Sequence, residues 1–127
     1  MKKLSETDRS KLQPVKEYLS RYLPAEENYR SLEDINTAYA EQQRERSHKI
    51  MAEVESAIAL LDVRRGKTII EKRFILGEPW KQIYRNMDIS RDTCFKMYRA
   101  AMVELYDRMV SIGISINSAE FGINTIT

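Results

Sequence analysis

One short stretch of the sequence carries the side chains with the clearest chemistry. Ser90 is followed at once by Arg91 and Asp92, and Lys96 and Arg99 come further along. Arginine and lysine donate hydrogen bonds to the acceptor edge of guanine, and an acidic side chain can accept one from cytosine. A serine at this place can cap a helix, which leaves the positive end of the helix dipole near phosphate. The pattern therefore favours a helix whose first turns read base edges in double-stranded DNA.

Two helices and a tight turn must position these side chains. The sequence from Pro79 to Met87 predicts a short helix, Asp88-Ile89 predicts a tight turn, and Ser90 begins a longer helix that runs to about Ser111. The residues that we expect to face inward on the longer helix are Cys94, Met97, Ala101, Leu105 and Met109. This is the spacing of a helix-turn-helix motif. We expect Trp80 to brace the two helices against each other.

The candidate DNA contacts extend beyond the first turn of the longer helix. Its outward arc comprises Ser90, Arg91, Asp92, Thr93, Phe95, Lys96 and Arg99. Lys81 lies on the shorter helix, and Arg64 and Arg65 lie at the start of the helix before it. We expect Arg64 and Arg65 to contact phosphate, although these two residues could be only the exposed start of a helix. Residues 64–108 carry 11 basic and 6 acidic side chains, a net charge of +5, whereas residues 1–63 have a net charge of −2.

The same region resembles two related groups of proteins. The segments Ile69–Ile83, Ile89–Thr93 and Ala101–Leu105 look like region 4 of bacterial sigma factors, which has an apolar helix, a glycine-centred loop, a short helix and a Ser/Thr-Arg-Glu entry. The Gly-x-Pro-Trp-Lys segment at residues 77–81 and the Ile-Ser-Arg-Asp-Thr segment at residues 89–93 are similar to phage late transcriptional regulators of the ArpU/RinA type. The resemblance covers roughly residues 54–111.

This resemblance implies a small helical protein of a temperate phage that binds DNA and controls late or packaging genes. It also implies that Arg91 and Asp92 take the base-reading positions and that Lys96 is a polar reader one turn on. Phe95 and Thr93 depart from the sigma pattern, so the promoter preference of sigma factors is not transferred. Phe95 is instead a candidate for contact with the methyl group of thymine.

The amino-terminal half also predicts helices. The first is expected to begin after Thr7 or Ser10 and to end at Leu23, before Pro24, and residues 24–30 are expected to form a polar connector. Ser31 begins a capping-box-like start, and no glycine or proline interrupts the chain from there to Arg65, which favours one long helix over two helices that break near Ser47.

The region between these helices and the motif, and the end of the chain, complete the prediction. Ile69, Ile70, Phe74 and Ile75 predict a short helix that closes at Leu76-Gly77, with a left-handed glycine. After Gly113 the residues alternate between apolar and polar, which indicates an irregular or short β tail.

Composition excludes several classes of function. The sequence of 127 residues has one cysteine, which allows neither an internal disulfide nor a structural zinc site. No apolar run suggests a signal peptide or a membrane span, and a cytoplasmic protein without membrane contact is expected. No catalytic triad, phosphate loop or paired histidine ligands occur, so we expect no enzyme, no cofactor and no metal.

We therefore predict an all-α protein whose parts have different roles. Residues 1–62 would form a helical region for oligomerisation or partner contact, residues 63–112 a helix-turn-helix DNA-binding domain, and residues 113–127 a tail. The expected function is sequence-specific transcriptional regulation by a homodimer, with host RNA polymerase as a further partner. The alternatives are a sigma-like factor that docks on RNA polymerase and a DNA packaging adaptor of the small-terminase kind.

Overall fold

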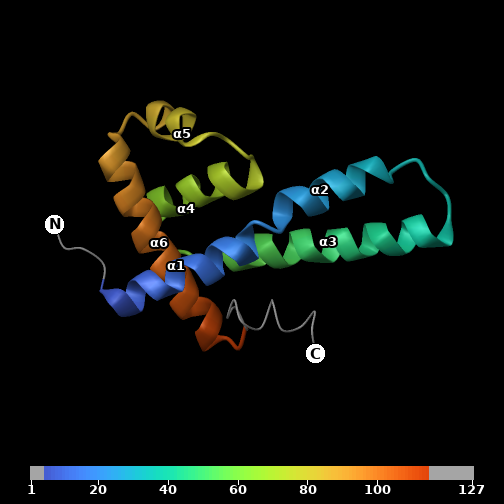
Figure 1. The fold of residues 1–127 in the computed structure, drawn as a ribbon, viewed down its shortest axis with the longest axis horizontal. Coiled ribbons are helices and arrows are strands. Elements are labelled where there is room, and N and C mark those ends of the chain that lie inside the picture. Colours follow the sequence, from blue (N-terminus) through green and yellow to red (C-terminus); the bar gives the residue numbers. More distant parts are fainter. Residues whose placement is uncertain (1–4, 115–127) are drawn as a thin grey trace.

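The computed structural model describes residues 5–114, and this part of the chain consists of helices and their connections (Figure 1). In chain order the elements are α1 (Glu6–Leu19), α2 (Tyr22–Ser31), α3 (Ala38–Ile58), α4 (Arg64–Ile70), the π-helical turn η1 (Glu71–Ile75), α5 (Trp80–Asn86) and α6 (Arg91–Ser111). The all-α prediction is confirmed for the described residues. The predicted tail falls almost wholly outside them. No helix in this part of the chain combines the length and apolar character that crossing a membrane requires.

The prediction was wrong between residues 20 and 37. Residues 24–30, expected to be a connector, belong to α2, and the connection instead occupies residues 32–37. Pro24 does not end a helix, because the chain has already turned after Leu19 and the proline lies in the first turn of α2. A proline is tolerated there since its missing N–H would have no partner within the helix.

The long helix predicted for residues 31–65 is continuous through its polar middle, but both of its ends were misplaced. α3 begins after Thr37, whose hydroxyl accepts the backbone N–H of Ala40 at 3.0 Å, and it ends at Ile58. Ser31 is no helix start. It is the last residue of α2, and its hydroxyl donates to the carbonyl of Asn28 at 2.9 Å.

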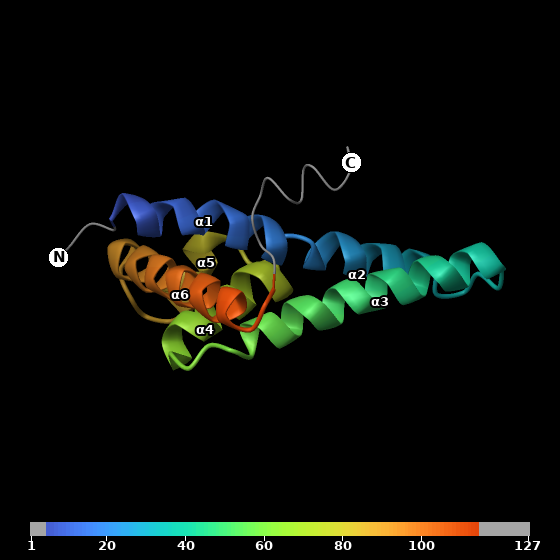
Figure 2. The same cartoon turned by 90° about the horizontal axis from the view of Figure 1, so that it is seen from below.

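The helices form a body and a projecting arm. α2 and α3 run antiparallel as a hairpin that extends away from α4, α5 and α6 (Figure 1), and α1 and α2 follow each other along one edge (Figure 2). The larger core takes buried side chains from both parts of the chain, among them Val15, Leu19, Val54, Ile58, Ile70, Met102 and Leu105. The regions on either side of residue 62 therefore share one core.

A close approach of α4 to α6 sets the frame for α5. A Cβ atom at Gly66 would lie 2.8 Å from the Cβ of Ala101, so the two helices meet where neither has a larger side chain. A second, smaller core of Ile69, Ile83 and Cys94 then joins α4, α5 and α6. The helix that carries the candidate DNA contacts is thus held from two sides.

Candidate nucleic-acid interface

The connection between α5 and α6 is fixed by backbone hydrogen bonds. The N–H of Ile89 donates to the carbonyl of Tyr84, and the N–H of Asp88 donates to the carbonyl of Arg85, each at 3.1 Å. Asp88 adopts a φ of 56°. These features define a Schellman motif, and aspartate is one of the few residues besides glycine that adopt this conformation readily. The predicted tight turn is confirmed, and it sets the direction of α6.

The start of α6 uses two hydroxyl groups. The hydroxyl of Ser90 accepts the backbone N–H of Thr93 at 3.1 Å and donates to the hydroxyl of Thr93 at 2.9 Å. The predicted cap is therefore confirmed, and the Thr93 side chain takes part in it. Beneath this turn Cys94 is 0% exposed, and burial raises the pKa of its thiol. This cysteine packs as a small apolar residue, as the sequence analysis expected.

The outer face of α6 presents the remaining candidate contacts together. Arg91, Asp92 and Arg99 are exposed, Phe95 and Lys96 are half-buried, and the five line one shallow hollow. None of the ion pairs between described residues involves any of these charged side chains. A face with three cations and one carboxylate, none of them neutralised by a neighbour, can donate to phosphate oxygens and base acceptors and can accept at one position.

An aromatic cluster backs this face. The ring of Trp80 lies 4.7 Å from the ring of Phe95 and 4.8 Å from the ring of Tyr98, measured between centroids. The guanidinium of Arg91 lies 5.4 Å from the centre of the Phe95 ring. The predicted bracing role of Trp80 is confirmed, because the side chain joins α5 to α6. The cluster also fixes the position of Phe95, which in turn supports Arg91.

The loop around Gly77 holds Trp80 in place through contacts that the sequence did not reveal. The Arg73 guanidinium lies 5.0 Å from the Trp80 ring and donates to the carbonyl of Glu78 at 3.1 Å. Lys72 pairs with the Glu78 carboxylate at 3.7 Å, and Gly77 has a φ of 70° between them. The predicted left-handed glycine is confirmed. The basic pair before it gave no signal in the sequence, because the contacts depend on how the loop closes.

The other candidate contacts lie on neighbouring helices. Lys81 is exposed on α5, and Arg64 and Arg65 are exposed in the first turn of α4. No ion pair between described residues involves these three cations. α4 meets α6 near its first turn, where a Cβ at Gly66 would lie 3.5 Å from the carbonyl of Met97. The first turn of α4 therefore lies close to the middle of α6. Lys81 comes directly after Trp80 in the sequence, at the start of α5.

No further chemistry of the site is indicated. Within residues 5–114, no group of three or more histidine, cysteine, aspartate and glutamate side chains is placed to hold a metal ion.

Comparisons of the chain with models of protein families, with curated proteins and with solved structures find no match. The resemblance to phage regulators and to sigma region 4 therefore rests on the motif residues alone and stays a prediction.

Proposed function

We propose that this chain is a sequence-specific DNA-binding transcriptional regulator rather than an enzyme. In this proposal α5, the turn and α6 form a helix-turn-helix motif, and α6 enters the major groove with the turns that follow Ser90. The observation that carries the proposal is the unneutralised outer face of α6, where Arg91, Lys96 and Arg99 surround one hollow. The capped helix start and the rigid turn behind it support the same reading, since a reading helix must be held in one orientation.

The contacts divide into readers and anchors. Arg91 and Lys96 would donate to guanine, and Asp92 would accept from cytosine. Arg64 and Arg65 would contact phosphate without reading sequence, as would Lys81 and Arg99. Ser90 and Thr93 are engaged in the cap and would act by orienting the first turn toward phosphate. Phe95, packed on Trp80, would support Arg91 and present only the open side of its ring to a thymine methyl group.

The resemblance supplies the proposed setting. A regulator of the ArpU/RinA type would act on late or packaging genes of a phage or prophage in a bacterial host cell. A single small motif contacts too few base pairs for strong selectivity, so we propose a homodimer that binds two half-sites. Host RNA polymerase would be a further partner of a protein that regulates transcription.

Selection of bound duplexes from a random DNA pool tests this proposal. We would use the chain of 127 residues at roughly physiological ionic strength, because non-specific binding depends strongly on salt. Enrichment of a paired motif with fixed spacing is the expected result. Bulk, salt-sensitive binding without enrichment would contradict it. Co-purification with core RNA polymerase would then favour a sigma-like factor, and ring assembly would favour a small-terminase-like adaptor.

Paired variants separate readers from anchors. Arg91→Ala and Lys96→Ala should each cost about 1–3 kcal/mol on the selected site and little on random DNA. Arg64→Ala combined with Arg65→Ala should weaken binding to all duplexes and reduce the slope of log affinity against log salt by about 0.9 per lost phosphate contact. Equal effects of both sets on every sequence would refute this division.

A further inference from the structure

The arm formed by α2 and α3 is thinly packed in its outer half. Between residues 28 and 50 the only buried side chains are those of Ala40 and Ser47. Asn28 donates to the hydroxyl of Ser47 at 2.8 Å, so the contact between the two helices is partly polar here. Helices in proteins gain most of their stability from packing an apolar face, and these small side chains bury little apolar area. Most side chains of the outer arm therefore remain available for packing against a partner.

A groove runs along one face of this arm. Pro24, Ala25 and Ile50 are among its walls, and it continues past the end of α1 to Lys16. Lys16 and Arg46 both line the groove, are exposed and take part in no ion pair between described residues. The groove thus combines apolar surface at Pro24, Ala25 and Ile50 with a mostly polar lining, in which basic side chains outnumber the one acidic side chain, Glu17.

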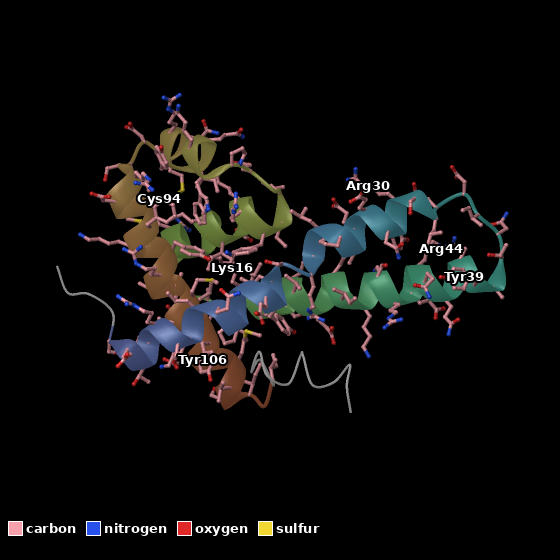
Figure 3. The ribbon with its side chains drawn as sticks, in the orientation of Figure 1. Lys16, Arg30, Tyr39, Arg44, Cys94 and Tyr106 are labelled. Atoms are coloured by element: carbon pink, nitrogen blue, oxygen red, sulfur yellow. The ribbon has the colours of Figure 1, made fainter. Side chains whose placement is uncertain are left out.

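The tip of the arm has the opposite character. Residues 31–42 contain three acidic side chains and no basic one. At this tip Tyr39 is 69% exposed and Ile35 is 43% exposed, and Figure 3 shows Tyr39 at the end of the molecule remote from Cys94. The guanidinium of Arg44 donates to the carbonyls of Leu32 and Ile35, which holds the connecting loop in one shape. The tip is therefore a preformed surface with exposed apolar side chains, on which three carboxylates outnumber the one guanidinium of Arg44.

We propose that a second copy of this chain docks on the arm, antiparallel, so that the tip of each copy lies in the groove of the other. The groove lines α3 from Gln43 to Ile50, which is within about 17 Å of Tyr39 along the helix. Reversal of the direction of a second copy therefore brings its tip over this groove. A two-fold axis makes both contacts at once, because the same surface serves both copies. The excess of carboxylates on the tip faces the excess of cations in the groove, and Tyr39 covers the apolar part of the groove lining.

This pairing gives the two arms the layout of a four-helix bundle. The pairing would explain how the proposed regulator forms a dimer. It rests on the proposed function only in the expectation that each copy has one DNA-binding end. In the paired arrangement those ends lie on opposite sides of the joined arms, because each body extends from the base of its own arm (Figures 1 and 2).

Charge reversal in the chain of 127 residues tests the pairing by sedimentation at micromolar concentration. Lys16→Glu with Arg46→Glu reverses the groove, and Glu33→Lys with Glu41→Lys reverses the tip. Either variant alone should weaken self-association at least about tenfold, because each places like charges opposite one another. An equimolar mixture of the two variants should restore a dimer, since every reversed groove then meets a reversed tip.

Controls separate pairing from folding and from DNA recognition. Arg9→Glu with Lys49→Glu makes the same change in net charge outside the groove and should leave association unchanged. Tyr39→Ala should weaken association several-fold without loss of helicity by circular dichroism. A monomeric wild-type chain, or a mixture that fails to restore pairing, overturns the proposal and leaves the groove to a partner of another kind. Failure of the DNA selection would leave this result untouched, because association is measured without DNA.

Discussion

Replacement of Trp80 by alanine is the sharpest test of how the candidate interface is held. The side chain makes ring contacts with Phe95 and Tyr98 and a cation–π contact with Arg73. Aromatic pairs contribute about 0.5–1.5 kcal/mol each and an exposed cation–π contact about 0.5–1 kcal/mol. Replacement of a fully buried tryptophan by alanine lowers the free energy of unfolding by about 3–5 kcal/mol. Because Trp80 is half-buried, we expect Trp80→Ala to lower the free energy of unfolding by about 2–4 kcal/mol.

Urea unfolding followed by far-ultraviolet circular dichroism measures this loss without relying on tryptophan fluorescence. Trp80→Phe is the matched control, since a smaller ring keeps part of both aromatic contacts and should lose less stability than alanine. DNA affinity should also fall in Trp80→Ala under conditions where the variant is folded, because Phe95 and Arg91 lose their support. A stability loss below about 1 kcal/mol would refute the reasoning, as would an alanine variant no weaker than phenylalanine.

Two further perturbations test the frame around the site. Gly66→Ala should destabilise the fold by about 1–3 kcal/mol in thermal or urea unfolding, because its Cβ would lie 2.8 Å from the Cβ of Ala101. In the Ala101→Gly background the same change should cost clearly less, and an equal cost would place the strain elsewhere. Burial raises the pKa of Tyr98 to about 12. Between pH 10.0, the ordinary pKa of tyrosine, and pH 12, the unfolded chain releases this proton while the folded chain keeps it. The free energy of unfolding should therefore fall as pH rises through this range, by at most about 1.4 kcal/mol per pH unit. Tyr98→Phe should flatten that decline in urea titrations, and an unchanged slope would contradict the assignment.

The elements next to the candidate interface were predictable because each has a local cause. Ser90 supplies a hydroxyl at the place where a helix start needs one, and Gly77 supplies the left-handed conformation that ends the preceding helix. The turn at Asp88 is set by the ends of the helices on either side of it. Such signals depend on residues a few positions apart, so they can be read without knowledge of the rest of the fold.

The amino-terminal half shows where local reasoning fails. Pro24 is compatible with the end of one helix and with the first turn of another, and the choice depends on burial of Tyr22 and Ala25 against α3. Ser31 fits a helix start by its own chemistry, yet it ends α2. Both errors arise because a capping residue or a proline permits a boundary and does not require one.

Residue type and spacing determined the charge pattern, the helices next to the candidate interface and the polar face of α6. Contacts between distant residues required the three-dimensional arrangement. Examples are the pairing of Gly66 with Ala101, the loop contact of Arg73 with Trp80, and the projection of the arm. The physical reason is that helix periodicity tells which side of a helix is apolar, whereas packing against other helices decides which apolar sides meet.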